Sequence, residues 1–266
     1  MFFSLAYFFV FGLIIGSFLN VLIIRLRDAE TILGRSFCRS CKHQIRWYDN
    51  IPLVSFILLR GTCRDCEEKI SWQYPVIEAV TGILFALIGY FFFSWSDPRA
   101  ILETVWLLGL VSILITLSVY DIRHLEIPVS LLIIGVVWTF LFLCIHLFFF
   151  EYGLPLWWTR LALGVFGGLV VGFFFFCLVW FSKETWMGWG DVWLGMLAGL
   201  VVGLRLSFFM LTLSFVLGAV IGITLLVFSK KSLKTQIPFG PFLALGVLLT
   251  LVLSQAVPDM LRFFLY

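Results

Sequence analysis

The chain alternates long apolar runs with short polar connections, and only one polar stretch is extended. A helix needs about 20 apolar residues to cross the hydrocarbon core of a bilayer. The pattern predicts eight transmembrane helices, near residues 2–24, 76–95, 101–120, 128–150, 160–181, 191–206, 207–228 and 239–257. The sixth run is short and leads directly into the seventh, so their boundary stays open. We therefore expect an all-α polytopic membrane protein with about eight transmembrane helices.

The composition agrees with this pattern. The chain is 62% hydrophobic and 12% charged, whereas soluble domains are roughly half apolar and a quarter charged. Most of these apolar side chains must face lipid, because a core of this size could not hold them. The net charge of +3 is small, and no stretch has the basic, polar character of a nucleic-acid-binding surface. We therefore expect membrane lipid as a partner and no nucleic acid.

The Lys and Arg residues predict the orientation of the spans. If the N-terminus is outside, fourteen of the 18 Lys and Arg residues fall in inward loops, including the Lys230, Lys231 and Lys234 cluster. Inward loops carry the excess of basic residues in membrane proteins. This orientation places the extended polar stretch, residues 25–75, in the cytosol.

Four of the six cysteines lie in this polar stretch. Cys38 and Cys41 form one CxxC pair, and Cys63 and Cys66 form a second pair 21 residues further on. Each pair offers two thiolates to one metal, and two pairs complete the tetrahedral sulfur shell that Zn²⁺ prefers. A cytosolic location disfavours disulfides. The spacing therefore predicts one structural zinc in a small knuckle loop, with a redox dithiol as the alternative.

Two aspartates occupy positions where a carboxylate is unfavourable. Asp121 lies at the inner end of the third span and Asp191 at the start of the sixth, so the topology places both on the same side at similar depth. Two close carboxylates share a proton, and such a pair performs the acid–base chemistry of an aspartic protease. Gly188 and Gly190 before Asp191 permit a close backbone approach. The alternative is that each aspartate only caps a helix or lies at the water interface.

Motifs spread over nearly the whole chain resemble one known family. They are Gly16-Ser-Phe-Leu-Asn-Val21, the paired CxxC loop, Trp47-Tyr-Asp-Asn-Ile-Pro-Leu53, Leu59-Arg-Gly61, Tyr74-Pro-Val-Ile-Glu-Ala-Val-Thr-Gly82, Asp121 with Ile127-Pro128, Gly188-Trp-Gly-Asp191 and Pro238-Phe-Gly-Pro241. In order and spacing together they resemble the bacterial type IV prepilin peptidases, which are bifunctional leader peptidases and N-methyltransferases of the GxGD class of membrane aspartic proteases.

The resemblance implies a division of labour along the chain. Residues 96–266 would form the peptidase part, with Asp121 and Asp191 as the catalytic dyad. Residues 1–95 would methylate the new N-terminus with S-adenosylmethionine, with Glu78 as the candidate residue for this step. The substrates would be type IV prepilins or pseudopilins, cleaved at the cytosolic face of the bacterial inner membrane. No glycine-rich nucleotide loop marks the methyl donor, so this activity follows from the resemblance alone.

The chain departs from the family pattern at three positions. Trp193 stands where the family usually has lysine, Arg39 where the first knuckle usually has proline, and Val129 where aspartate is frequent. None of the three is a dyad residue or a zinc ligand. Two other function classes stay open: a cation or proton-coupled transporter that uses Asp121 and Asp191 as ion ligands, and a membrane scaffold whose zinc loop docks a partner.

Overall fold

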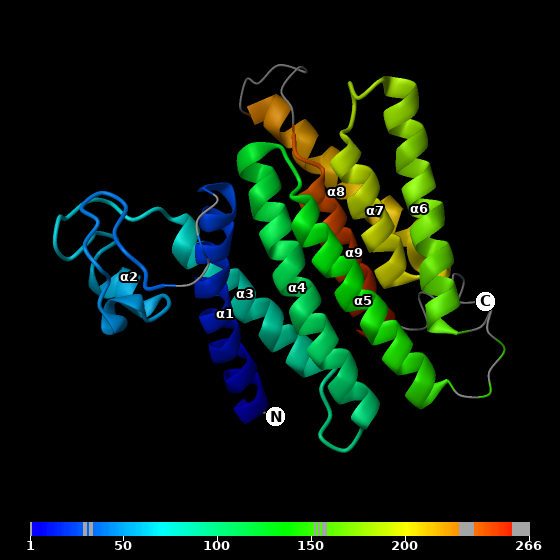
Figure 1. Ribbon diagram of the computed structural model, residues 1–266, viewed down its shortest axis with the longest axis horizontal. Helices are drawn as coiled ribbons and strands as arrows, with labels where there is room; N and C mark the ends of the chain where they lie inside the picture. The colour runs from blue at the N-terminus through cyan, green and yellow to red at the C-terminus, as the bar shows by residue number, and fades with distance from the viewer. Residues whose placement is uncertain are drawn as a thin grey trace. The chain divides into compact units, whose positions relative to one another are not determined.

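The computed structural model describes residues 2–28, 31, 34–151, 153, 155, 159–228 and 237–256, and it divides into two compact units. Unit 1 is Met1–Phe93 and unit 2 is Ser94–Tyr266. Unit 1 contains α1 (Phe2–Asp28), the short 3₁₀ helix η1 (Trp47–Asn50), α2 (Val54–Leu58) and α3 (Gln73–Phe91). Unit 2 contains α4 (Pro98–His124), α5 (Val129–Phe150), α6 (Arg160–Ser182), α7 (Trp189–Val202), α8 (Leu204–Phe228) and α9 (Gly240–Ala256) (Figure 1).

The all-helical membrane fold is confirmed, and each of the eight predicted apolar runs contains a helix. Within the described ranges, six helices are long and apolar enough to cross a membrane. The other two, α7 and α9, have 14 and 17 residues, which corresponds to about 21 and 25 Å of helix. They are therefore shorter than the hydrocarbon core of about 30 Å. The Lys230–Lys234 cluster lies outside the described residues.

The boundary between the sixth and seventh runs differs from the expectation. The helix breaks at Gly203, three residues before the predicted boundary at 206. Gly203 has a φ of +78°, a left-handed conformation that glycine adopts without steric strain. The position of the turn is therefore determined by Gly203. The apolar run continues across this residue, so hydropathy alone does not mark the break.

Glycines bring α1 and α3 of unit 1 into close contact. Gly12 and Gly16 are four residues apart on α1, the spacing that lets membrane helices approach closely. A Cβ atom at Gly12 would lie 2.8 Å from Gly82 Cα, and one at Gly16 would lie 2.8 Å from Glu78 Cα. The two helices are therefore joined backbone to backbone, and this contact holds Glu78 against α1.

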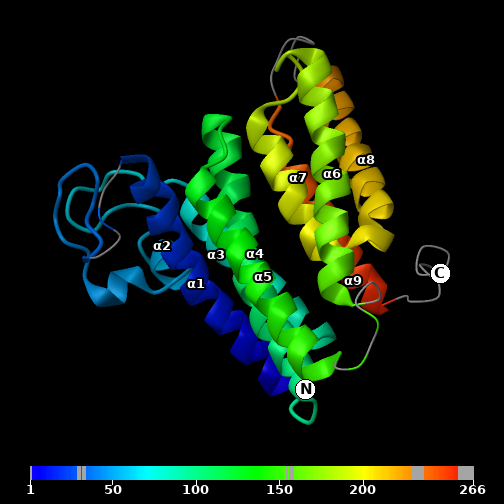
Figure 2. The same ribbon diagram turned by 45° about the vertical axis from the view of Figure 1, so that its right-hand side comes forward.

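Unit 2 contains a second glycine-packed helix pair, α6 and α7 (Figure 2). A Cβ atom at Gly199 of α7 would overlap the carbonyl oxygen of Gly167 of α6. The helix α9 packs in turn against α4, α7 and α8. Because α9 contacts both α4 and α7, it connects the two helices that carry Asp121 and Asp191.

Polar side chains of unit 2 contact one another where three helix ends come together. At the N-terminal ends of α4 and α6, Arg160 Nη1 lies 2.6 Å from Glu103 Oε1. His146, which is 5% exposed, has its Nδ1 3.2 Å from Glu151 Oε1. This cluster joins α4, α5 and the start of α6 at the opposite end of α4 from Asp121.

The α6–α7 contact generates a stability prediction. We expect Gly199→Ala to lower the free energy of unfolding by about 1–3 kcal/mol, because the added methyl group overpacks a backbone contact. Gly222→Ala on α8 is the matched control, since the nearest atom to its Cβ would be 3.8 Å away. Thermal unfolding in detergent measures both variants. Equal stability of the two would contradict the close α6–α7 packing.

Candidate active site and metal centre

Asp121 lies in the last turn of α4 and is buried, with 6% of its surface exposed. Its Oδ2 accepts a hydrogen bond of 2.9 Å from the backbone N–H of Gly240, the first residue of α9. The N-terminus of a helix is electropositive and favours an anion. A Cβ atom at residue 240 would lie 2.6 Å from this oxygen, so the contact requires glycine.

Asp191 is the third residue of α7, and its Oδ2 accepts a 3.2 Å hydrogen bond from the N–H of Gly188, the N-cap residue. This is the carboxylate half of a capping box. Asp191 is half-buried, and Leu194, one turn further along α7, lies beside the same Gly240 that binds Asp121. The structure therefore brings together two aspartates that are 70 residues apart in the sequence.

The two glycines before Asp191 have different surroundings. A Cβ atom at Gly190 would lie 3.0 Å from Ile127 Cβ, so Gly190 provides the close approach that was expected of it. Gly188 is open, because no atom lies closer than 4.0 Å to its Cβ position. Its φ of −91° is accessible to any residue. Its contact with Asp191 uses only the backbone N–H, so close packing explains Gly190 and does not explain Gly188.

Trp193 lies on the same helix as Asp191 and is 51% exposed. A side chain two residues after Asp191 points to another face of the helix, because successive residues differ by about 100°. The position is therefore at the outer surface of unit 2. Nothing in the structure explains why tryptophan stands at this position.

The four loop cysteines come together in unit 1. Their sulfur atoms all lie within 4.8 Å of one another, and Cys38 Sγ lies 3.8 Å from Cys66 Sγ. Four sulfurs at about 2.3 Å from a tetrahedral zinc ion are about 3.8 Å apart. The arrangement of Cys38, Cys41, Cys63 and Cys66 thus fits one zinc ion.

The two CxxC pairs are built alike. The backbone N–H of Cys38 donates to His43 O, and that of Cys63 donates to Glu68 O, each over 2.9 Å. Backbone hydrogen bonds, that from Cys41 above all, lower the pKa of the Cys38 thiol to about 7. Each pair therefore forms the same kind of turn, and in the first pair its N–H groups favour the thiolate that a metal requires.

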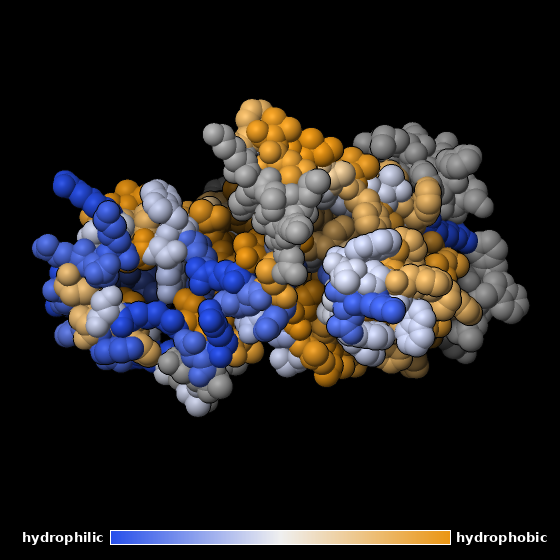
Figure 3. Space-filling view, turned by 90° about the horizontal axis from the view of Figure 1, so that it is seen from above, coloured by the Kyte–Doolittle hydropathy of each residue, from blue (hydrophilic) through white to orange (hydrophobic). Residues whose placement is uncertain are grey.

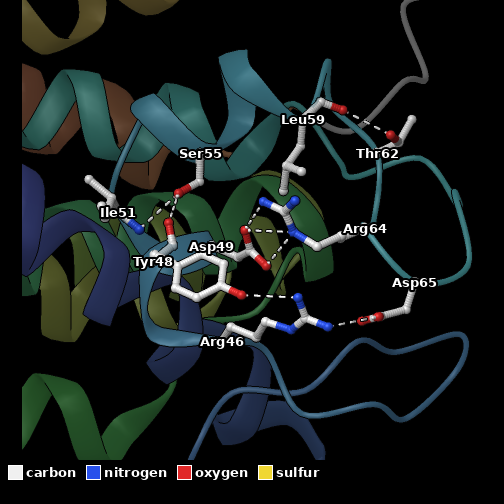
Figure 4. A network of polar contacts seen from close by, with 9 residues as sticks. All are labelled: Arg46, Tyr48, Asp49, Ile51, Ser55, Leu59, Thr62, Arg64 and Asp65. Atoms are coloured by element: carbon white, nitrogen blue, oxygen red, sulfur yellow. Dashed lines mark hydrogen bonds and ion pairs between the residues drawn. The ribbon is translucent and has the colours of Figure 1, made fainter.

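Two ion pairs hold the knuckle loop, one to α1 and one within the loop itself. Arg39 Nη2 lies 2.8 Å from Asp28 Oδ2, so the arginine that replaces the family's proline links the first knuckle to the end of α1. Arg64 of the second knuckle holds Asp49 of η1 with three hydrogen bonds of 2.6–3.1 Å (Figure 4). These hydrogen bonds lower the pKa of the Asp49 carboxyl group. Hydrophilic side chains gather over this loop, at the left of Figure 3.

Glu78 is buried in unit 1, with 7% of its surface exposed. Its Oε2 accepts a 2.9 Å hydrogen bond from the N–H of Leu53, the N-cap residue of α2. Ser17 of α1 also hydrogen-bonds the Glu78 carboxylate. Glu78 thus joins α3, α1 and the start of α2 in one polar contact.

A second polar contact next to Glu78 was missed by the sequence interpretation. Asn20 is fully buried; its Nδ2 donates to Gly16 O and Tyr74 O, and its Oδ1 accepts from Gln73 Nε2. Asn20 lies inside a family motif, and a buried amide in an apolar run is the signal that could have identified it.

The chain matches two family models that describe related proteins. Residues 10–92 match the bacterial peptidase A24 N-terminal domain, and residues 108–223 match the type IV leader peptidase family. No solved structure matches the chain at a significant level.

Curated relatives span most of the chain. A prepilin leader peptidase/N-methyltransferase of Stutzerimonas stutzeri is 33% identical over 89% of this chain and 86% of its own length. The protein of that name from Pseudomonas aeruginosa is 29% identical over 88% and 85%. A type 4 prepilin-like proteins leader peptide-processing enzyme of Escherichia coli is 34% identical over 91% of both chains.

The cysteine geometry generates a metal prediction. We expect the purified protein to carry about one zinc ion per chain. The Cys66→Ser variant should lose this zinc, and a protease should then cleave its loop within residues 34–72. Structural zinc supplies the folding free energy of small loops, so a chelator should open the loop and leave the helical circular dichroism unchanged. Cys144→Ser, in α5 and outside the cluster, is the control that should retain zinc. A zinc-free protein with a protease-resistant loop would show that the prediction is wrong.

Proposed function

The chain belongs to the type IV leader peptidase family, and from this premise we propose that Asp121 and Asp191 are the two carboxylates that cleave prepilin-like precursors. The enzyme is a leader endopeptidase with N-methyltransferase activity, in agreement with its relatives' name, prepilin leader peptidase/N-methyltransferase, and the proposed dyad makes it an aspartic peptidase. One observation carries the dyad assignment. Two carboxylates from distant parts of the sequence lie on helices that both contact α9 at Gly240, and each carboxylate accepts a hydrogen bond from a backbone N–H.

The geometry supports a simple division of the proton transfers. Two interacting carboxyl groups hold one proton between them. The ionised group accepts a proton from water while the water oxygen bonds to the scissile carbonyl carbon. The neutral group donates its proton to the leaving nitrogen as the carbon–nitrogen bond breaks. Afterwards the pair again holds one proton, with the two roles exchanged.

Asp121 and Asp191 differ in how far solvent can reach them. Asp121 is fixed by Gly240 at the start of α9 and is almost removed from solvent. Asp191 is half-buried and lies in the first turn of α7, so water and a substrate strand reach the pair from its side. The helix N-termini of α7 and α9 stabilise the negative charge that the pair carries.

The proposed location is the bacterial inner membrane, with the dyad at the cytosolic face. The excess of Lys and Arg in the predicted inward loops supports this orientation. Type IV prepilins and pseudopilins are the proposed substrates, with a basic leader on the cytosolic side and an apolar helix in the bilayer. The transporter alternative lacks support, because the family assignment and the relatives' names describe a peptidase.

For methyl transfer we propose Glu78 as the residue that accepts the proton from the new N-terminal amine. S-adenosylmethionine, when bound, supplies the methyl group. An ammonium group cannot attack carbon, so an amine that is methylated must first lose a proton to a base. Glu78 is a buried carboxylate that is oriented by Leu53 N–H and Ser17.

The dyad assignment is tested by conservative substitutions. We expect Asp121→Asn and Asp191→Asn each to lower the rate of prepilin cleavage by roughly 10²- to 10⁴-fold, because each removes one proton-transfer group. Glu126→Gln is the matched control: Glu126 is exposed, lies five residues after Asp121 and takes no part in the site. Cleavage is measured with detergent-solubilised enzyme and a purified prepilin. Persistent cleavage by either aspartate variant would refute the assignment.

A pair of variants separates the two roles of Glu78. Glu78→Gln keeps an oxygen that accepts from Leu53 N–H, and we expect it to cleave normally but to leave the mature N-terminus unmethylated. Glu78→Ala removes the acceptor as well, so the start of α2 should also lose protection from proteolysis, since a buried donor is left without a partner. Mass spectrometry of the mature pilin N-terminus provides the readout. Normal methylation by Glu78→Gln would show that Glu78 is only an anchor.

A further inference from the structure

The loop of unit 1 exposes an apolar face beside the zinc knuckles. Six large side chains form it, and we refer to them as the α2 face. They are Trp47 (76% exposed), Ile51 (42%), Val54 (48%), Ile57 (72%), Leu58 (75%) and Trp72 (73%). A cluster of exposed large apolar residues of this kind marks a surface that is covered by a partner or by lipid.

The position of α2 along the membrane helix α3 indicates whether a partner or lipid covers the α2 face. Leu53, at the start of α2, donates to Glu78, the sixth residue of α3. Five residues of helix correspond to about 7.5 Å, so α2 starts beside the second turn of α3 and does not lie beyond its end. The loop therefore folds back along the span.

The length of α3 indicates how deep in the bilayer the start of α2 lies. Its 19 residues extend about 28 Å, which is close to the hydrocarbon thickness of about 30 Å. If α3 spans the core, its first residue lies at the boundary of the hydrocarbon, and the backbone of Glu78 lies up to about 7.5 Å below it, with Leu53 bonded to its side chain. The side chains of the α2 face are then at the level of the lipid headgroups and upper acyl chains.

The backbone around α2 meets the requirement of that environment. Polar backbone groups at membrane depth must be satisfied within the protein. Ile51 N–H donates to Ser55 Oγ, which itself donates to Tyr48 O (Figure 4). Leu53 N–H donates to Glu78, and Pro52 has no N–H to satisfy. The backbone N–H groups of Ile51, Leu53, Val54, Ser55 and Ile57 are thus bonded within the protein, while the large side chains of the segment are apolar and exposed.

The charges around the α2 face fit an anionic surface. Residues 34–72 contain seven Lys and Arg against four Asp and Glu. Arg60 and Lys69 near α2 are both exposed, and basic residues at this level are attracted to anionic lipid headgroups. Arg64 anchors Asp49 of η1, so Trp47 is presented on a fixed support. Tryptophan is also the residue type that is enriched at membrane interfaces.

We propose that the α2 face is a membrane-interface anchor: it lies in the anionic lipid leaflet that α3 enters, with Ile57 and Leu58 among the upper acyl chains. The occupant of the face is lipid of the enzyme's own membrane. Apolar burial and basic residues together are the combination that holds interfacial helices in place. The proposal does not depend on the dyad assignment.

Photo-cross-linking of the full-length protein tests this anchor. Benzoylphenylalanine replaces Ile57 in one variant and Glu68, an exposed residue of the second knuckle, in another. Both are reconstituted in vesicles of equimolar phosphatidylglycerol and phosphatidylcholine, irradiated and analysed by mass spectrometry. We expect lipid adducts at position 57 and none at position 68. The Asp121→Asn background should give the same adducts, which separates this result from the peptidase assignment.

Two further variants test the apolar and the charged contributions. Leu58→Asp should abolish the lipid adduct at position 57, whereas Leu58→Ala should retain it; bound zinc verifies that the loop is folded in both. Arg60→Gln and Lys69→Gln should each lower the share of phosphatidylglycerol among the adducts by up to about fivefold. Absence of lipid adducts at position 57 would overturn the proposal. An adduct there with unit 2, or with added prepilin in place of lipid, would equally overturn it.

Discussion

A carboxylate at the depth of the lipid must have its charge satisfied inside the protein, and in this chain a backbone N–H at the start of a helix provides part of that satisfaction. Asp121 accepts from Gly240 at the start of α9, Asp191 from Gly188 at the start of α7, and Glu78 from Leu53 at the start of α2. Each acid is thereby oriented without a basic partner, which leaves it able to exchange protons.

This constraint also explains why glycine is needed where the helices meet. Asp121 reaches the α9 backbone only because residue 240 has no side chain, and Glu78 lies against α1 only because residue 16 has none. Close backbone contact replaces the hydrophobic driving force that is absent between helices in lipid. The positions of the acids and the packing of the helices are therefore parts of one arrangement within each unit.

The hydrophobic pattern predicted most of the fold, because lipid imposes a length and an apolar composition on every span. It also predicted that Asp121 and Asp191 emerge on one side, and the CxxC spacing predicted the sulfur cluster. The predicted break lay three residues after Gly203, because the backbone conformation of a single glycine decides where the helix ends. A hydropathy average over many residues does not detect such a conformation. The Asp121–Gly240 contact joins residues 119 positions apart, and the Leu53–Glu78 contact joins a loop to a span, so neither follows from local periodicity.

The paired knuckles have a consequence for how unit 1 assembles. The first knuckle follows α1, and the second ends just before α3. A metal that joins Cys41 to Cys63 removes the intervening segment from the flexible connection between the two helices, so fewer residues must be ordered when they pair. The entropy lost on closing a connection rises with its length. Metal capture by the loop would thus raise the effective concentration of α3 for α1, so that the loop of unit 1 would favour the pairing of its two membrane helices.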